Sequence, residues 1–460
     1  MTQTDDSTED PAPPWEMLRS LINAQDRPAA QAFVDTVPSE DLPRVMSLLG
    51  NEESARLLEM LEPATSGALM ESIPEAQATD VLGELDSEKA AEIVAQLPSN
   101  EQADLISNLP DDEAQAILEQ MPPAEAADAE RLAQYPEGTA GAIMITEYLS
   151  FPHEVTVGEV LEDLRRNTER YQRHDVQYIY VTDTTGILKG VLRLRDLVLT
   201  SERTPVEQIM STAMEVVPVQ APLATLRDFF ATRAYRGVPV TDRAGRLVGV
   251  VRHADVAEAV GEREASDHLK AQGIVGGEEL RTMPTLTRAW HRLSWLSINI
   301  VLNIVAASVI ALYQETLAAV IVLAVFLPII SDMSGCSGNQ AIAVSMREIT
   351  LGLIRPSDAF RVWSKELTVG LINSLVLGTL LGLAAYFWKG NIYLSLVIGL
   401  ALAVNTIVSV SLGGLVPLFL RSMQFDPALA SGPILTTVTD MCGFFLVLSF
   451  ATALLPLIAG

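Results

Sequence analysis

The sequence is poor in the residues on which nucleic-acid binding and disulfide scaffolds depend. It contains 31 Lys and Arg against 58 Asp and Glu in 460 residues, which gives a formal net charge of -27 at pH 7. Nucleic-acid binding draws its affinity from basic residues on phosphates, so this acidity argues against it. There are only two cysteines, Cys336 and Cys442, and both fall in apolar sequence. We expect free thiols rather than a disulfide.

The polar half of the sequence also lacks the motifs of an enzyme. It shows no paired nucleophile and base, no Gly-rich phosphate loop and no metal-hydrolase motif, so no catalytic residue is predicted. The opening residues MTQTDDSTEDPAPPW lack the basic and apolar regions of a signal peptide. We therefore expect a disordered lead-in over residues 1–20, followed by a cytoplasmic domain.

A twelve-residue repeat follows, beginning at Pro38. From Met1 to Leu132 the chain holds 29 acidic and 6 basic residues. The eighth and twelfth positions of each unit are apolar, four residues apart, so they share one helical face. The eighth positions are Val45, Leu57, Leu69, Val81, Ile93, Leu105 and Ile117, and the twelfth are Leu49, Leu61, Ile73, Leu85, Leu97, Leu109 and Met121. The repeat predicts an all-α superhelix of short helices over residues 21–135. Its acidic residues are either a solvated surface or a cation sensor.

A second repeat has an offset of 59 residues. YIYVTDTTGILKGVLRLRDLV (178–198) aligns with GVPVTDRAGRLVGVVRHADVA (237–257), and each predicts strand, tight turn, strand and helix start, with Asp196 and Asp255 as N-caps. The pattern resembles tandem α/β CBS domains over residues 136–262. CBS pairs often bind adenine nucleotides through a hydroxyl three residues after the glycine, where Arg193 and Arg252 stand here. ATP binding is therefore unsupported, and a packing and dimerisation module is favoured.

The last part of the chain, residues 292–460, has the composition of a membrane domain. Five apolar segments are long enough to cross a lipid bilayer and predict a five-helix transmembrane domain. They are Leu293–Tyr313, Leu317–Ser337, Leu367–Phe387, Tyr393–Leu420 and Pro427–Leu455. Basic residues precede the first segment and fill the loop after the second, which predicts a cytoplasmic N-terminus and an external C-terminus. The basic residues are Arg288, Arg292, Arg347, Arg355, Arg361 and Lys365.

Two acidic residues, Asp332 and Asp440, fall inside these segments. An intramembrane charge costs on the order of 3 kcal/mol and normally lines a pathway. Helical spacing puts Gly432, Thr436 and Asp440 on one face, where all polar groups are oxygens. Oxygen ligands without His indicate a hard cation such as hydrated Mg²⁺, which two copies of Asp440 would bind across a dimer axis. The alternatives are a protonated Asp440 bonded to a neighbouring helix and thiolate ligation by Cys442.

The second apolar segment ends in FLPIISDMSGCSGNQAIAVSMRE. Pro328, Gly335 and Gly338 predict a broken helix amid polar residues that include Asn339. Irregular backbone at membrane depth is tolerated where it lines a cavity, so this stretch predicts a second wall of the pathway. The alternative is a close-packing motif of small residues.

The order of these parts, together with QYPEGTAGAIM, GCSGNQ and FDPALASGPILTTVTD, resembles the MgtE family of magnesium channels over nearly the whole chain. The resemblance implies a homodimer in the bacterial cytoplasmic membrane with a pore along the dimer axis. It implies that Asp440 binds hydrated Mg²⁺ and that a long connecting helix, residues 263–291, plugs the cytoplasmic side. Cys336, Ser334 and Asp332 depart from the family pattern, which keeps a cobalt or broad divalent-cation transporter as an alternative. A membrane sensor that transports nothing is the rival class.

The resemblance also implies regulatory Mg²⁺ on the cytosolic domains. The family's acidic positions on the second CBS domain fall in QAPLATLRDFFATRAYRG, which is mostly neutral or basic. The remaining candidates are acidic residues of the connector and of the N-terminal repeat. They are Asp255, Glu258, Glu262, Asp267, Asp111 and Asp112.

Overall fold

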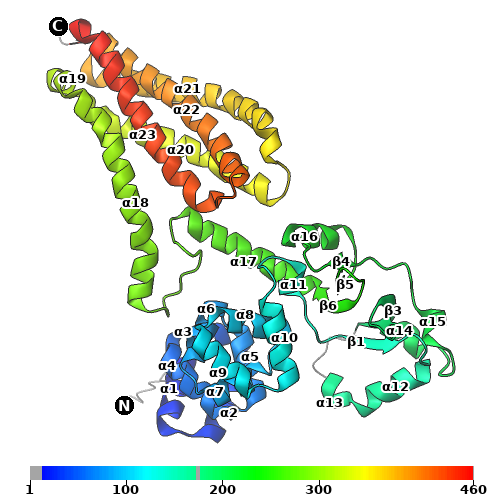
Figure 1. The fold of residues 1–460 in the computed structure, drawn as a ribbon. Helices are drawn as coiled ribbons and strands as arrows, with labels where there is room; N and C mark the ends of the chain where they lie inside the picture. Colours follow the sequence, from blue (N-terminus) through cyan, green and yellow to red (C-terminus); the bar gives the residue numbers. More distant parts are fainter. Residues whose placement is uncertain (1–12, 172–176, 459–460) are drawn as a thin grey trace, which may run out of the picture. The chain divides into compact units, whose positions relative to one another are not determined.

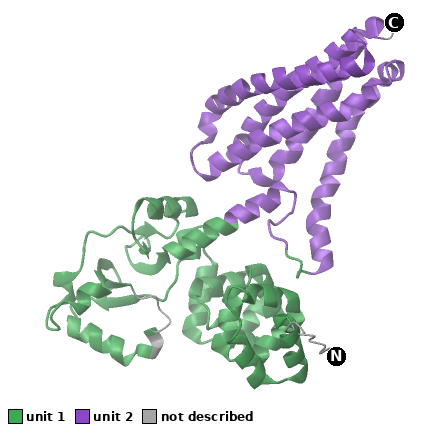
Figure 2. Cartoon of the chain, turned by 180° about the vertical axis from the view of Figure 1, so that it is seen from behind, with its two compact units in different colours: residues 1–262, 280–283 green, residues 263–279, 284–460 purple. Residues whose placement is uncertain are grey.

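The computed structural model describes residues 13–171 and 177–458 and divides the chain into two compact units. One unit holds residues 1–262 with 280–283, and the other holds residues 263–279 with 284–460 (Figures 1 and 2). The first contains short helices and two small sheets. The second consists of long apolar helices.

Ten short helices form the N-terminal part of the first unit. The first residues of α4 to α10 are spaced by twelve, which confirms the predicted period. The helices are α1 (Pro14–Ala24), α2 (Arg27–Val34), α3 (Leu42–Leu49), α4 (Asn51–Met60), α5 (Pro63–Ser72), α6 (Glu75–Gly83), α7 (Ser87–Val94), α8 (Ser99–Asn108), α9 (Asp111–Gln120) and α10 (Pro123–Ala133).

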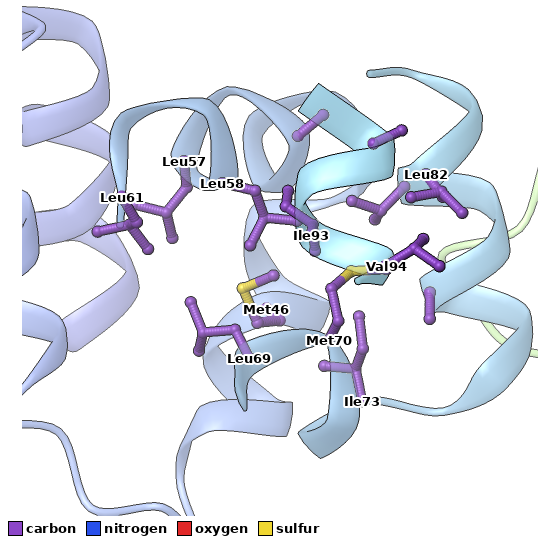
Figure 3. Packing of buried hydrophobic residues seen from close by; sticks show 14 of the residues in the cluster. Met46, Leu57, Leu58, Leu61, Leu69, Met70, Ile73, Leu82, Ile93 and Val94 are labelled. Carbon is purple, nitrogen blue, oxygen red and sulfur yellow. The ribbon is translucent and has the colours of Figure 1, made fainter. Parts of the chain in front are cut away.

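The repeated apolar positions form the core of this helical domain. All seven eighth positions are buried, as are all the twelfth positions except Leu85, which is partly buried and packs against the same core. Figure 3 shows Leu57, Leu69 and Ile93, which come from three different repeats, in this core. Each helix is too short to be stable alone, so the domain depends on contacts between neighbouring repeats.

The predicted disordered lead-in is wrong in its last part. Helix α1 begins at Pro14 and buries Leu18 and Ile22 in the first unit's core. The proline and acidic residues at the N-terminus suggested disorder. However, Pro14 occupies the first turn of α1, where the helix does not need the N–H that proline lacks. Residues 1–12 lie outside the described residues.

Two three-stranded sheets follow, in the orders β1-β2-β3 and β4-β5-β6. In each sheet the first pair is parallel and the second antiparallel, and the offset of 59 between β2 and β5 and between β3 and β6 is confirmed. The strands are β1 (Leu149–Pro152), β2 (Tyr178–Thr182), β3 (Leu188–Arg193), β4 (Val217–Pro218), β5 (Gly237–Thr241) and β6 (Leu247–Arg252). The helices around them are α11 (Ala140–Ile143), α12 (Val157–Arg166), α13 (Thr168–Tyr171), α14 (Leu194–Val198), α15 (Val206–Ile209), α16 (Leu223–Thr232) and α17 (His253–Ala271).

The tight turns between paired strands are fixed by equivalent aspartates. Asp183 accepts hydrogen bonds from the backbone N–H groups of Thr185 and Ile187, and Asp242 does the same in the second repeat. The predicted N-caps are wrong, because α14 begins at Leu194 and α17 at His253. Asp196 and Asp255 therefore lie inside the first turn of their helices. The positive end of the helix dipole stabilises a carboxylate there.

Long helices lying side by side form the second unit, and successive ones run in alternating directions (Figure 1). They are α18 (Thr285–Leu312), α20 (Leu323–Thr350), α21 (Ala359–Lys389), α22 (Ile392–Ser422) and α23 (Pro427–Ala453), joined or followed by α19 (Gln314–Ala319), η1 (Pro356–Asp358) and α24 (Leu455–Ile458). In the described residues, four stretches are long and apolar enough to cross a membrane, and α20 is not among them. The four are Thr285–Leu312, Pro356–Lys389, Ile392–Ser422 and Pro427–Ala453.

The predicted break in the second apolar segment is wrong. Helix α20 is continuous over 28 residues and includes Pro328, Gly335 and Gly338. A Cβ at Gly338 would lie 2.3 Å from the Ser409 hydroxyl of α22, and one at Gly413 would lie 2.3 Å from the Gly338 carbonyl. Gly338 and Gly413 therefore allow close helix packing, which was the alternative interpretation of this stretch.

The predicted connecting helix over residues 263–291 is also wrong. Helix α17 ends at Ala271 and α18 begins at Thr285. Gly273, Gly276 and Gly277 between them have positive φ angles of 84°, 96° and 76°, which no regular right-handed helix accommodates. The segment folds back instead, and Trp295 of α18 packs against Gly273.

Candidate ion-conduction site

Asp440 lies at the centre of α23. It is thirteen residues from Pro427 and thirteen from Ala453, so about 20 Å of helix extends on either side. Its half-buried carboxylate accepts a hydrogen bond from the Ser331 hydroxyl of α20. Across the described part of the chain, no Lys or Arg forms an ion pair with it. The charge is therefore held at membrane depth without a neutralising cation.

Oxygen atoms precede Asp440 on α23. Pro433 lies inside the helix and has no N–H to donate, so the normal helical bond to the carbonyl of Leu429 is missing. The carbonyl of Pro433 accepts hydrogen bonds from the hydroxyls of Thr436 (3.2 Å) and Thr437 (2.7 Å). This turn of α23 presents a local excess of carbonyl and hydroxyl oxygens.

A large cleft of about 1470 Å³ opens beside these residues in the second unit. It brings together three predicted pore residues, Asn339 of α20 with Gly432 and Thr436 of α23. Asp267 of α17, one of the predicted regulatory residues, lines the same cleft. Asp440 is not one of the lining residues and lies one helical turn beyond Thr436.

Asp332 takes a different position from the other predicted pore residues. It is exposed on α20, seven residues before Asn339, which is exposed as well. This spacing of two helical turns puts both on one face of α20. In an isolated protomer that face of α20 carries an exposed carboxylate and an exposed amide.

A group of carboxylates gathers where the helical domain meets the second CBS domain. Helix α8 is capped by Glu147, which accepts hydrogen bonds from the N–H (3.0 Å) and hydroxyl (2.9 Å) of Ser99. Burial, together with repulsion from Glu71 and Glu258, raises the pKa of Glu101 to about 8. Burial raises the pKa of Asp104 to about 7, and charges that include Glu75 and Glu262 add to the shift. Ionisation of Glu101 and Asp104 in this interface is therefore unfavourable.

The remaining predicted regulatory residues differ in their surroundings. Asp255 is buried and paired with Arg252, whose guanidinium lies 2.6–3.0 Å from both carboxylate oxygens. Burial raises the pKa of Asp267, which pairs with Arg263 at 3.4 Å. Asp111 and Asp112 are exposed in the first turn of α9. Among residues 13–171 and 177–458, three or more His, Cys, Asp or Glu side chains do not converge in a metal-binding arrangement.

Sequence reasoning missed Glu101 and Asp104. The repeat gives partial information about them. They occupy the fourth and seventh positions of a unit whose eighth position is the buried Leu105. The period shows that such places flank the core, but it does not show which repeat meets another domain.

Comparison with known proteins agrees with the order of these parts. Residues 37–138 match the family described as the MgtE intracellular N domain, residues 140–202 and 206–262 match CBS domains, and residues 327–450 match MgtE, described as a divalent cation transporter. The magnesium transporter MgtE of Thermus thermophilus is 34% identical over 331 residues, which cover 72% of this chain and 73% of that protein. This chain belongs to the MgtE family. The magnesium transporter MgtE of Enterococcus faecalis is 31% identical, with 71% and 72% covered.

Two solved structures are similar to part of this chain. The soluble part of a magnesium transporter is 23% identical and covers 55% of this chain and 98% of its own, with a TM-score of 0.49. The cytosolic domain of the Mg²⁺ channel MgtE in complex with ATP is 29% identical and covers 52% and 94%, with a TM-score of 0.34.

Membership of the MgtE family assigns this chain to membrane transport rather than to enzymes. It is a multi-pass membrane protein with CBS domains and a helical N domain, and its family transports divalent cations. Both cysteines are free, as predicted, with Cys336 exposed and Cys442 half-buried.

The two CBS domains enclose a small cavity between their sheets. Its lining includes the aromatic rings of Tyr148, Tyr178 and Tyr180 and the side chains of Arg236 and Arg252. Aromatic rings and guanidinium groups are the chemistry that would bind a nucleotide base and phosphate. However, Arg252 already pairs with Asp255, and the carboxylate of Glu147 lines the same cavity, which disfavours a phosphate.

Proposed function

We propose that this member of the MgtE family is a Mg²⁺-selective channel that mediates Mg²⁺ uptake and is gated by intracellular Mg²⁺. The observation that carries this proposal is Asp440, a half-buried carboxylate at the centre of a membrane-spanning helix, whose hydrogen-bond partner among the described residues is the hydroxyl of Ser331. Such a charge is costly unless a cation occupies its surroundings. The relatives named as magnesium transporters support Mg²⁺ as that cation.

The cleft beside α23 suits a hydrated ion. Mg²⁺ keeps several of its waters and binds through one or two carboxylates, so its site needs oxygen acceptors and space rather than a closed protein cage. Asn339, Gly432 and Thr436 supply a wide polar approach to Asp440 from the end of the unit that holds Asp267. In this proposal the ion passes them with its waters and meets the charge one turn further on.

A homodimer completes the pathway. The exposed face of α20 that carries Asp332 and Asn339 cannot face lipid at acceptable cost, so a second protomer or water must cover it. Two protomers related by a twofold axis would present two Asp440 carboxylates to one divalent ion. This arrangement neutralises the ion and both carboxylates together.

The orientation of the membrane unit follows from its basic residues. Because successive helices alternate in direction, the start of α18, the end of α20, the start of α21 and the end of α22 fall at one end (Figure 1). These ends carry most of the unit's basic residues, whereas the opposite end carries Lys389. By the positive-inside rule the former end is cytoplasmic, which puts the C-terminus outside. Such a protein resides in the bacterial cytoplasmic membrane.

Gating rests on the carboxylates at the interface of α8 and α17. At low Mg²⁺ and near pH 7, the pKa values of about 8 and about 7 keep Glu101 mostly protonated and Asp104 about half protonated, because Glu258 and Glu262 repel their ionised forms. Mg²⁺ that bridges these groups would stabilise the closed arrangement of the cytosolic domains. A ligand shifts a two-state equilibrium only through its differential affinity, so several weak sites must act together.

A broad divalent-cation transporter, including cobalt transport, is the second candidate. The observation that favours it is Cys336, exposed on α20 among the polar residues of GCSGNQ. A thiolate prefers softer ions than Mg²⁺. The thiol is three residues from Asn339 and therefore near the same face of α20.

Flux through the purified full-length protein in liposomes tests both functions. Mg²⁺, Co²⁺ and Ni²⁺ are supplied separately outside, with Mg²⁺ inside varied. Flux of Mg²⁺ that falls as internal Mg²⁺ rises supports the gated channel. Equal flux of all three ions would favour the broad transporter, and no flux of any ion would leave a sensor that transports nothing.

A further inference from the structure

Asn405 is a polar residue at the centre of the membrane unit that the proposed pathway does not use. It is fully buried in α22, with none of its surface exposed. Its Nδ2 donates a hydrogen bond of 3.0 Å to the backbone carbonyl of Thr439 on α23. Its Oδ1 has no hydrogen-bond partner among the residues that the structure describes. Thr439 directly precedes Asp440, so Asn405 acts on the backbone that carries the proposed ion-binding carboxylate.

Gly443 permits this contact. In an α-helix the carbonyl of Thr439 points toward residue 443, one turn later. A Cβ added at Gly443 would lie 2.8 Å from Nδ2 of Asn405, closer than real Cβ contacts. The absence of a side chain at Gly443 lets the amide reach a carbonyl that already takes part in the helix. Asn405 and Gly443 therefore form one structural arrangement.

The neighbouring helix holds Asp440 from another side. Ser331 of α20 donates a hydrogen bond to the Asp440 carboxylate, while α20 is tied to α22 by the Ser409 hydroxyl, 2.5 Å from the Ser334 carbonyl. α22 thus fixes the backbone at Thr439, and α20 fixes the side chain at Asp440. Rotation or sliding of α23 would break both contacts.

We propose that Asn405 is a positioning residue for ion conduction, which sets the rotation and height of α23 so that Asp440 meets a hydrated Mg²⁺. This inference rests on the proposed channel function. Mg²⁺ has strict octahedral geometry and dehydrates reluctantly, so its recognition depends on a fixed carboxylate. A loosened Asp440 keeps its charge and still attracts divalent ions, but it discriminates less among them. Asn405 therefore acts on selectivity through Asp440 without contacting the ion.

The test uses Asn405→Leu in the full-length protein, because leucine keeps the volume and removes the donor. Loss of one buried hydrogen bond is expected to lower Mg²⁺ flux about tenfold. The ratio of Co²⁺ to Mg²⁺ flux should rise, a change that a simple loss of folded protein would not produce. Thr406→Val is the matched control, since Thr406 is also fully buried on α22 but, among the described residues, its hydroxyl bonds within its own helix, to the Leu402 carbonyl at 2.8 Å.

A second variant keeps the test decisive if Asn405→Leu does not fold. Gly443→Ala leaves Asn405 in place but pushes its amide from the Thr439 carbonyl, so it should change the flux ratio in the same direction. An unchanged ratio in whichever variants fold, or an equal change in Thr406→Val, would overturn the positioning role. If the unmodified protein conducts no divalent ion, the channel proposal itself fails. If it conducts and the variants match it, only the role of Asn405 fails.

Discussion

The ammonium of Lys270 lies 3.3 Å from a carboxylate oxygen of Asp426. Lys270 belongs to the end of α17, and Asp426 caps α23 by accepting a hydrogen bond of 2.9 Å from the N–H of Ala428. The stem of Lys270 is covered by Gly277, where an added Cβ would lie 2.6 Å from Cε. The connector is thus fastened to the start of the helix that carries Gly432, Thr436 and Asp440, beside the cleft.

Removing the charge of Lys270 should favour the open channel. Lys270→Met keeps most of the stem and deletes the ion pair with Asp426. The pair is partly exposed, so its loss should shift the internal Mg²⁺ concentration for half-inhibition upward by only about threefold. Flux measured against internal Mg²⁺ in liposomes checks this shift. Lys89→Met, which removes a charge paired with Glu92 on the N domain, is the control, and a similar shift there would show that the Lys270–Asp426 pair has no special role.

Neutralising Asp440 should abolish divalent flux without unfolding the protein. Asp440→Asn keeps the shape and removes the charge, and an uncompensated charge at membrane depth contributes cost rather than stability. The expected loss of Mg²⁺ flux is at least about hundredfold, the change that loss of one charge-stabilising group commonly causes. Glu315→Gln, an exposed acid of α19, tests whether any lost charge has this effect. Normal uptake by Asp440→Asn would contradict the pore assignment.

Regular repeats made much of the cytosolic fold predictable. The period of twelve located the helix starts at Asn51, Pro63 and Glu75, because one residue pattern was sampled seven times. The offset of 59 located the paired strands in the same way. Each of these features is local, and repetition removed the ambiguity of any single unit.

The failures came from glycines whose role depends on distant residues. Gly338 marks a close contact with Ser409 of another helix, not a break, and no local pattern distinguishes the two. Gly273, which has a φ of 84° and donates its N–H to the Lys270 carbonyl, ends helix α17, and this glycine was visible in the sequence. Asp440 was predictable because a lone charge in an apolar run is anomalous by itself. Asn405 was not predictable from the sequence, because its proposed role depends on a hydrogen bond to the Thr439 carbonyl of another helix, α23.

Mg²⁺ binding at the acidic interface should release protons near neutral pH. The folded-state pKa values of about 8 for Glu101 and about 7 for Asp104 lie above the ordinary values of 4.5 and 3.8. Bridging Mg²⁺ requires the ionised forms, so on the order of one proton per protomer should be released at pH 7. Calorimetric titration of the purified protein with Mg²⁺ in buffers of different ionisation enthalpy measures that number. Identical heats in all buffers would show that these two groups do not bind the ion.

The same pKa shifts fix the direction of the pH dependence. Between about pH 4 and pH 8 the folded interface binds more protons than the unfolded chain, so its stability falls as pH rises through this window. Without Mg²⁺, the cytosolic domains should therefore unfold at a lower temperature at pH 8 than at pH 6. Saturating Mg²⁺ should reduce the difference, because it replaces the protons. A stability that rises over this pH range would contradict the burial of Glu101 and Asp104.

Charge removal and domain removal should have opposite effects on gating. In Glu101→Gln with Asp104→Asn, neither group can ionise, so the repulsion that their ionised fraction exerts on Glu258 and Glu262 disappears and the cytosolic domains should close without Mg²⁺. Flux at low internal Mg²⁺ should then fall, and its dependence on internal Mg²⁺ should flatten. Deleting about the first 130 residues removes the closing domain altogether, so the truncated channel should conduct at Mg²⁺ concentrations that shut the full-length protein.

The comparison needs a control of equal charge. Glu84→Gln with Glu88→Gln removes two exposed carboxylates from the same N domain, neither of which contributes to the raised pKa values of Glu101 and Asp104. If the acidic interface is the sensor, this pair should leave the dependence of flux on internal Mg²⁺ unchanged. If both double variants alter gating equally, the net charge of the domain acts through its general field. If neither double variant nor the deletion alters gating, the acidic residues form a solvated surface and Mg²⁺ is sensed elsewhere in the chain.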